Sequence, residues 1–221
     1  MAPKKPRDEI RRFLVSIAMT NCFAYVSEGE CMVVDPGDEG DVIAKHLEDV
    51  KVVAIVGTHG HGDHVDGVTA LKEATGAPFL LHAADVEEAQ TSRCMSMLGL
   101  PSAGAPAPDR TIAEGDVIEV GSATFTVYET PGHTPGGVVL VGGGSAEGIA
   151  FAGDTIFCGS VGRTDLAGGD ARTLLASLHH LPDIMDKDTL LLCGHGDDTS
   201  LADELRSNPF LQPGAERWFG L

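Results

Sequence analysis

The sequence predicts a mixed α/β (α+β) fold in which two β-sheets pack face to face between outer helices, a four-layer αββα sandwich. Two observations lead to this prediction. Strand-rich sequence followed by helix-bearing sequence occurs twice, once in each half of the 221 residues. A hydrophobic content of 43% is enough to bury one sizeable core. We therefore expect a single domain over residues 1–221, with a frayed tail over residues 1–11.

Short apolar runs bounded by turn residues predict the elements of the first half. The second and third strands are joined in a hairpin by residues 27–30, and the sequence Asp35-Pro36-Gly37 ends the third strand. His64 and Asp66 are expected at the N-terminal end of the second helix. The predicted strands are 13–15, 22–26, 31–35, 51–56 and 78–81, and the predicted helices are 41–47, 68–74 and 83–90.

Residues 91–109 are predicted to form a long loop that flanks the functional site. Pro101, Pro106 and Pro108, with alanines and glycines between them, disfavour regular structure in its second part. Met95 and Met97 in its first part fit the role of packing residues, and a lid over the site is the alternative.

The second half returns to strands and ends with two helices. The third and fourth of these strands are expected to pair around a hairpin turn at residues 142–144, which lack the lysine of a phosphate-binding loop. Asp170 is expected to cap the first helix. The predicted strands are 117–120, 124–128, 138–141, 148–152 and 189–193, and the predicted helices are 170–180 and 199–206.

Residues 59–64 carry three histidines and a carboxylate, His59, His61, Asp63 and His64, just after the buried strand 51–56. Imidazole and carboxylate together suit Zn, Mn or Fe. Alternate residues of a tight loop point to opposite sides, so His59 and His61 can serve one metal while Asp63 and His64 serve a second. A solvated His-rich surface tract is the alternative. The glycine spacing and the position at a strand end favour metal binding.

Three isolated residues of the same ligand types follow downstream, again at the ends of strands or in rigid loops. His133 lies in a Pro-Gly-His-Thr-Pro-Gly sequence, Asp154 follows a strand, and His195 lies between two glycines. Two dications about 3.5–4 Å apart can share a water molecule and lower its pKa toward about 7, which yields a nucleophile at neutral pH. One carboxylate can span both ions, and Asp154 is the candidate. The other histidines, His46, His82, His179 and His180, are expected to face solvent or cap helices.

The seven-residue set together with the His-x-His-x-Asp-His sequence resembles the signature of the metallo-β-lactamase-fold superfamily. The resemblance implies that His59, His61 and His133 hold the first metal. It also implies that Asp63, His64 and His195 hold the second, that Asp154 bridges them, and that Asp63 orients the nucleophilic water. Zinc is the expected metal, with iron or manganese as alternatives.

Further sequences resemble the short glyoxalase II-like hydrolases of this superfamily, which are hydroxyacylglutathione hydrolases. They lie at residues 34–37, 130–134, 153–155, 159–165, 194–196 and 208–211. This resemblance implies a cytoplasmic thioesterase that hydrolyses S-D-lactoylglutathione by attack of a metal-bridging hydroxide. Full-length glyoxalase II carries a C-terminal helical domain that grips glutathione, whereas only 26 residues follow His195 here. The thiol half of the substrate therefore stays open.

Other functions compete with this interpretation. Persulfide dioxygenases of the superfamily share the Gly-Arg-Thr-Asp sequence but use one iron, held by the residues that match His59, His133 and Asp154. Lactonase activity is a third hypothesis, and β-lactamase activity is disfavoured because Asp154 stands where secreted enzymes typically have cysteine. A non-enzymatic metal-binding module would be expected to lack a ligand, and none of the seven is missing.

Four more residues are candidates for supporting roles. Thr58, Asp35 and Asp66 are predicted to hold the imidazole tautomers of the ligands, with a capping or turn role as the alternative for each. Arg163 is a candidate contact for a substrate carboxylate, and a surface ion pair with Asp165 is the alternative.

Charge and cysteine content restrict partners and compartment. Fifteen Lys and Arg against 33 Asp and Glu give a formal net charge of −18, which repels nucleic acids and anionic membranes. A signal peptide is disfavoured because Thr20 and Asn21 interrupt the apolar run 13–26. The five scattered cysteines are typical of reduced thiols in the cytoplasm. We expect a small-molecule substrate, and the sequence leaves the oligomeric state open.

Overall fold

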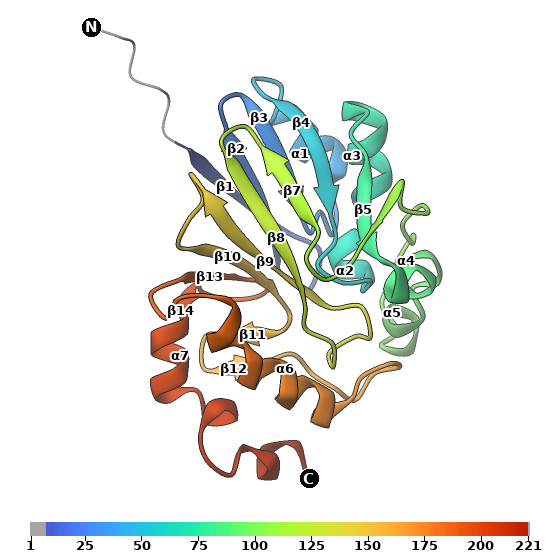
Figure 1. Cartoon of the computed structure of the whole chain (residues 1–221). Coiled ribbons are helices and arrows are strands. Elements are labelled where there is room, and N and C mark those ends of the chain that lie inside the picture. Colours follow the sequence, from blue (N-terminus) through green and yellow to red (C-terminus); the bar gives the residue numbers. More distant parts are fainter. Residues whose placement is uncertain (1–7, 221) are drawn as a thin grey trace, which may run out of the picture.

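The computed structural model describes residues 8–220, and two six-stranded sheets form its centre (Figure 1). The first sheet has its strands in sequence order, with β1 to β3 antiparallel and β3 to β6 parallel. Its strands are β1 (Glu9–Val15), β2 (Thr20–Ser27), β3 (Glu30–Val34), β4 (Lys51–Val56), β5 (Phe79–His82) and β6 (Arg110–Ile112).

The second sheet has the order β14-β13-β10-β9-β8-β7, and its pairs are antiparallel except for β10 with β13. Two short strands, β11 (Ile156–Phe157) and β12 (Ser160–Val161), form a separate hairpin. The strands of the second sheet are β7 (Val117–Val120), β8 (Ala123–Glu129), β9 (Val138–Gly144), β10 (Ile149–Gly153), β13 (Leu190–Cys193) and β14 (Thr199–Ser200).

Helices lie beside the outer faces of both sheets, so the predicted αββα sandwich is confirmed (Figure 1). The helices next to the first sheet are α1 (Gly40–Lys45), α2 (Gly62–Val65), α3 (Val68–Thr75), η1 (Ala83–Asp85), α4 (Val86–Thr91) and α5 (Arg93–Met97). Those next to the second are α6 (Ala171–Ile184), α7 (Leu201–Ser207), η2 (Pro209–Leu211) and η3 (Ala215–Phe219).

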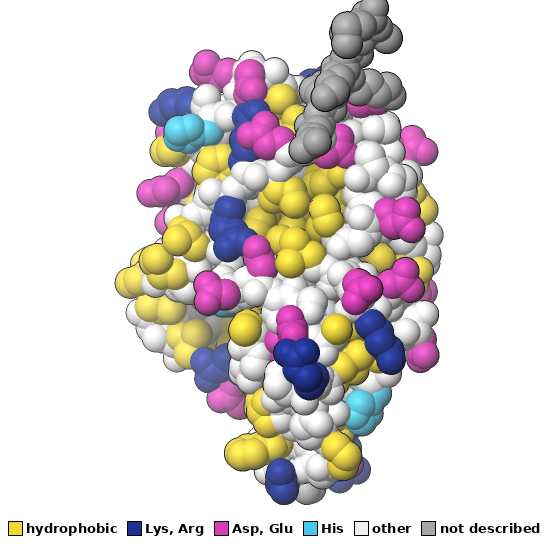
Figure 2. All heavy atoms as spheres, turned by 90° about the vertical axis from the view of Figure 1, so that its left-hand side faces the viewer, with side chains coloured by type: hydrophobic (Ala, Val, Ile, Leu, Met, Phe, Trp, Pro, Cys, Tyr) yellow, Lys and Arg dark blue, Asp and Glu magenta, His cyan; other side chains and the backbone are white. Residues whose placement is uncertain are grey.

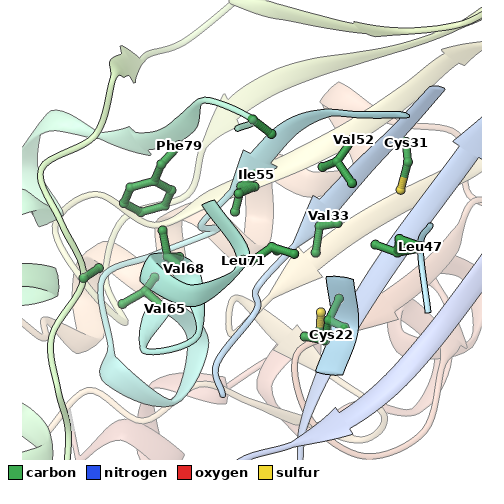
Figure 3. Close-up of a cluster of buried hydrophobic side chains, with 14 of the residues drawn as sticks. Cys22, Cys31, Val33, Leu47, Val52, Ile55, Val65, Val68, Leu71 and Phe79 are labelled. Atoms are coloured by element: carbon green, nitrogen blue, oxygen red, sulfur yellow. The ribbon is translucent and has the colours of Figure 1, made fainter. Parts of the chain in front are cut away.

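Side chains alternate along each strand between the two faces of the sheet, and this divides the core into layers. In β2, Cys22 and Ala24 face the helices, while Phe23 and Tyr25 face the second sheet. Both faces of the strand are buried, which explains its nearly continuous apolar sequence. Figure 3 shows the layer under the helices, where Leu71 of α3 lies among side chains of the first sheet.

The layer between the sheets is built from aromatic and branched side chains. Tyr25 packs edge to face against Phe125 of β8, with ring centroids 4.9 Å apart, and Phe23 lies 5.6 Å from Phe151 of β10. Leu174 and Leu178 of α6 close the third layer on the other face of the second sheet. The two sheets are thus held rigidly against each other, which fixes the loops at their ends.

The N-terminal prediction needs correction. Residues 9–11 were expected to be frayed but belong to β1, where Arg11 donates two 2.7 Å hydrogen bonds to the carboxylate of Asp49. Residues 1–7 of the predicted tail lie outside the described residues. Among residues 8–220, no helix combines the length and the apolar composition needed to cross a bilayer.

Three predictions within the chain are also corrected. His64 belongs to the separate helix α2 and not to the start of α3, because the chain turns at Asp66 and Gly67. Residues 91–109 are not a continuous loop, since they contain α5. Residues 142–144 extend β9 and pair with β8, and the turn follows them. A Cβ atom at Gly142 would lie 2.3 Å from the carbonyl oxygen of Ala146, so this close approach requires glycine.

Candidate metal centre

The seven predicted ligands come from four loops at one end of the sandwich. Strand β4 leads into the loop that carries His59, His61, Asp63 and His64, while β8 leads into the loop of His133. The other two ligands, Asp154 and His195, follow β10 and β13, which are parallel neighbours. Parallel strands end at the same edge of a sheet, and this brings segments far apart in the sequence together.

His59, His61 and His133 form the first group. One ligand atom from each residue lies within 4.8 Å of the others, and the ring centroids are 4.6 to 4.8 Å apart. All three side chains are buried. The structure therefore brings together the three histidines that were predicted to share one metal.

Asp63, His64 and His195 form the second group. The Nε2 atoms of His64 and His195 lie 3.2 Å apart, and Oδ2 of Asp63 lies 3.7 Å and 3.5 Å from them. Oδ2 of Asp63 also accepts a 3.1 Å hydrogen bond from the hydroxyl of Thr20. His64 is buried and the other two side chains are partly exposed, and the group offers two imidazoles and one carboxylate to a single cation.

Asp154 lies between the two groups. Its Oδ1 atom is 3.4 Å from Nε2 of His64, and its Oδ2 atom is 3.5 Å from Nε2 of both His133 and His195. The side chain is only 9% exposed. One carboxylate thus reaches both groups, as a bridging ligand must.

The polar atoms of the cluster fit divalent metal ions. Nε2 of His59, His61 and His133 and Oδ1 of Asp154 are buried without a hydrogen-bond partner among the described residues. Such atoms cost free energy unless a cation or donor lies between them. Imidazole nitrogen and carboxylate oxygen are the donor set that Zn, Fe and Mn accept. The residues present therefore fit a pair of such ions.

The ionisation of the apo cluster follows from burial and mutual charge. Burial, together with the neighbouring histidines, lowers the pKa of His59 and lowers that of His61 to about 3. Burial alone would lower the pKa of His64, but Asp154, Asp63 and Asp35 raise it to about 9. The pKa of Asp154 is lowered to about 2, because His64 and His195 outweigh the opposing effect of burial. Both His59 and His61 are thus neutral and ready to bind a cation.

Asp35 and Thr58 contact two of the predicted ligands. Asp35 accepts hydrogen bonds of 2.7 Å from the backbone N–H and the hydroxyl of Thr58, and its Oδ2 atom lies 3.1 Å from Nδ1 of His64. The Thr58 hydroxyl oxygen lies 3.2 Å from Nδ1 of His59. Because its proton goes to Asp35, this oxygen accepts from the Nδ1–H of His59 and leaves Nε2 free as a ligand.

We expect Asp35→Asn to lower the affinity of the site for metal about 10- to 100-fold, the usual cost of losing a group that orients a ligand. The amide has only one oxygen, so it cannot accept hydrogen bonds from the backbone N–H and the hydroxyl of Thr58 with two separate oxygens. It also places no negative charge beside His64. Competition with a chromogenic chelator measures the change. Asp38→Asn, an exposed position three residues away, is the matched control. Equal affinities of the two variants would contradict the assigned role.

Asp66 does not have its predicted role. Its Oδ1 atom accepts hydrogen bonds from the hydroxyl of Ser102 at 2.7 Å and from the backbone N–H of Gly104 at 3.1 Å. The carboxylate therefore links residues 102–104 to the segment that follows His59–His64. Among the described residues it forms no hydrogen bond with an imidazole.

Arg163 forms the ion pair with Asp165 that was the alternative to a contact with a substrate carboxylate. Its guanidinium donates hydrogen bonds of 2.6 and 2.8 Å to the carboxylate of Asp165. The backbone carbonyl of Arg163 has a second role, because it accepts a 2.7 Å hydrogen bond from Nδ1–H of His133. This bond fixes the tautomer of His133, with Nε2 toward Asp154. Sequence patterns cannot reveal a role that depends on a main-chain atom.

The sequence analysis also missed Asp85, which joins two ligand loops. This buried carboxylate accepts from the backbone N–H of Gly60 at 2.8 Å, from the hydroxyl of Thr134 at 2.6 Å and from the backbone N–H of Gly136 at 2.7 Å. Its place in an acidic helical segment gave no signal of this role. Asn21 was missed in the same way, since its side-chain amide donates to the carbonyls of Cys193 and Gly196 around His195.

Two glycines are required by the crowding around Asp154. Gly153 has φ of +48°, and a Cβ atom there would lie 2.4 Å from the hydroxyl of Thr58. A Cβ atom at Gly194 would lie 2.3 Å from Oδ1 of Asp154 and 2.8 Å from Cε1 of His64. The glycines beside the ligands thus allow the second group to close.

The remaining histidines lie away from the cluster, as predicted. His46, His179 and His180 are exposed. His82 caps η1, where its Nδ1 atom accepts from the backbone N–H of Ala84.

Comparison with known proteins places this geometry in a family. The model of the metallo-beta-lactamase superfamily matches residues 17–195. The hydroxyacylglutathione hydrolase GloC of Haemophilus influenzae is 32% identical over 209 residues, which cover 89% of this chain and 95% of that protein.

Two solved structures are similar over most of the chain. BLEG-1 B3 metallo-β-lactamase has a TM-score of 0.85 and 30% identity, with coverage of 93% of this chain and 100% of that one. TTHA1623, solved in a di-iron-bound form, has a TM-score of 0.81 and 33% identity, with coverage of 91% and 100%. Because the family model spans most of the sequence and includes all seven clustered residues, the chain belongs to the metallo-β-lactamase superfamily and is a metal-dependent hydrolase of that fold.

Proposed function

We propose that the protein is a binuclear metal-dependent thioesterase that hydrolyses S-D-lactoylglutathione or a related acyl thioester. The observation that carries this proposal is the pair of complete ligand groups with Asp154 between them. Similarity to a hydroxyacylglutathione hydrolase supports the thioester as substrate. The net charge of −18 supports a small-molecule substrate over nucleic acid or an anionic membrane, and the face drawn in Figure 2 has scattered acidic side chains and no continuous basic patch. The five free cysteines support the proposed location in the cytoplasm.

His59, His61 and His133 would hold one ion, and Asp63, His64 and His195 the other, with Asp154 shared. Zinc is proposed, and the di-iron form of TTHA1623 supports iron as an alternative. When bound, the ions supply a hydroxide at neutral pH and polarise the carbonyl oxygen of the substrate.

The chain's own residues position the reaction. Asp63 belongs to the second group, and Thr20 holds its carboxylate, so this carboxylate can also accept a hydrogen bond from an attacking water and orient it. The oxygen of water bonds to the carbonyl carbon, the carbon–sulfur bond breaks, and the thiolate that leaves takes up a proton. The products are a carboxylic acid and a thiol.

Metal content and turnover on one sample test the proposal. Protein purified without added metal should contain close to two ions per chain and should hydrolyse S-D-lactoylglutathione. A single iron per chain, with oxygen consumed in the presence of glutathione persulfide and no thioester turnover, would assign the dioxygenase function instead. A β-lactam and a lactone are included as control substrates because of the similarity to BLEG-1.

Removal of the ions with EDTA should lower the melting temperature by about 10–20 °C. Each ion present at 100 times its dissociation constant stabilises the folded state by about 2.7 kcal/mol, so two ions contribute about 5.4 kcal/mol. For a chain of this size that corresponds to roughly 2–4 °C per kcal/mol. Differential scanning calorimetry measures the shift, and restoring zinc should reverse it. An unchanged melting temperature after complete removal of metal would count against the cluster as the binding site.

A further inference from the structure

A small apolar cavity opens directly onto the candidate metal centre. Its volume is about 160 Å³, and five of the predicted ligands, His61, Asp63, His133, Asp154 and His195, lie on its floor. Binding pockets for whole ligands usually measure about 300–1,000 Å³. The cavity therefore has room for one part of a thioester, the group attached to the reacting carbonyl.

We propose that this group is an apolar acyl chain, and the inference rests on the thioesterase function proposed above. The side chains that carry it form what we call the apolar wall, which consists of Met95, Leu98, Leu100, Leu166 and Ala18. Such a wall stabilises hydrocarbon by burying it and offers no hydrogen bond to a hydroxyl group.

The polar inventory of the cavity supports this assignment. Among the described lining residues that are not predicted ligands, Arg163 is the single charged one, and Asp165 already occupies its guanidinium through two hydrogen bonds. The lining holds no serine, threonine, asparagine or glutamine among those residues. Outside the ligand set, the hydroxyl of a lactoyl group would meet only the N–H groups of Arg163 that Asp165 leaves free and the thiol of Cys94, which is a weak hydrogen-bond donor.

The rim of the cavity is apolar as well. Leu98 is 43% exposed. Ala18 lies between Ile17 and Met19 at the turn from β1 to β2, and these two side chains are 75% and 57% exposed. Large apolar side chains exposed beside a pocket are typical of binding surfaces. A chain longer than the cavity can hold would continue across this rim.

Contacts with α4 and α2 hold part of the apolar wall in place. Glu88 accepts a 2.7 Å hydrogen bond from the backbone N–H of Cys94 at the start of α5, and Asp66 fixes Ser102 beyond the wall. A Cβ atom at Gly62 would lie 2.8 Å from Cγ of Met95, so this side chain packs directly against α2. The part of the wall around Met95 is thus fixed relative to α2, which carries Asp63, and does not need to order when substrate binds.

The experiment compares two thioesters of the same thiol on metal-loaded protein. S-hexanoylglutathione and S-D-lactoylglutathione differ only in the acyl group. Each buried methylene is worth about fourfold in kcat/KM, so the hexanoyl ester should be preferred by at least about tenfold. Leu98→Ser should lower this preference about fivefold or more. Met97→Ser, the neighbouring exposed position that does not line the cavity, should leave the preference unchanged.

The outcomes separate this inference from the function on which it rests. A preference for the lactoyl ester would overturn the apolar acyl group while keeping the thioesterase. Equal effects of Leu98→Ser and Met97→Ser on the preference would also overturn it, because the wall would then not contact the acyl chain. Turnover of neither thioester by protein with two ions per chain would reject the thioesterase and the inference together.

Discussion

Asp154→Asn should reduce metal content from two ions per chain to fewer than one and lower kcat/KM for the thioester by about 10³-fold or more. The carboxylate of Asp154 reaches His64 on one side and His133 on the other, so its loss affects both groups. An amide has one oxygen to offer and no negative charge to offset the repulsion of two cations. Metal ions supply several kcal/mol of transition-state stabilisation, and each 1.36 kcal/mol is tenfold in rate.

Elemental analysis and the thioesterase assay on the same preparation measure this effect. Far-UV circular dichroism should show that the variant is folded, because Asp154 lies in a loop after β10 and forms no backbone contact of the sheet. Asp183→Asn makes the same chemical change at an exposed position of α6 and should retain both ions and activity. Wild-type turnover by Asp154→Asn would remove the basis of the binuclear proposal.

Asp85→Ala should destabilise the folded protein by about 3–5 kcal/mol. The carboxylate is fully buried and accepts three hydrogen bonds of 2.6 to 2.8 Å. Hydrogen bonds to a charged group contribute about 1.5–3 kcal/mol each, and the variant leaves two backbone N–H groups and one hydroxyl buried without a partner. Urea unfolding measures the loss, which should appear as a lower midpoint at an unchanged slope.

The same substitution should weaken metal binding, because Asp85 joins the loop of His59 and His61 to the loop of His133. A 10- to 100-fold loss of affinity is expected. Asp116→Ala also removes a carboxylate that accepts from a backbone N–H, that of Ala113, but at an exposed turn, and it should change stability and affinity little. If both variants unfold at the same urea concentration, Asp85 does not have the structural role assigned to it.

The clustering of the seven residues was predictable because their signals are local. His59, His61, Asp63 and His64 lie within six residues, and the strand before them was predicted with its observed bounds, 51–56. His133 and His195 lie in proline- and glycine-rich sequences that indicate rigid loops. The αββα order followed from two strand-rich halves, since each sheet buries both of its faces.

The supporting contacts were not predictable, because they depend on residues that only the fold brings together. Asp85 contacts Gly60 and Gly136, which are 25 and 51 residues away, so nothing in the sequence around it shows the role. Residues 142–144 look like a turn by composition, yet the pairing of β9 with β8 extends the ladder through them. The role of Arg163 resides in a carbonyl oxygen that every residue has.

The arrangement of the ligands on four loops has a consequence for how the protein acquires its ions during synthesis. His64 and His195 are 131 residues apart, although their Nε2 atoms touch in the folded chain. A nascent chain that has emerged only as far as β12 has both β4 and β10 but cannot complete the second group. At a translation rate of about 5–20 residues per second, His195 emerges seconds after β12. Under the binuclear proposal, binding of the second ion is therefore a late step that follows completed folding, and it should stabilise the contact between the two halves of the chain once β13 has docked.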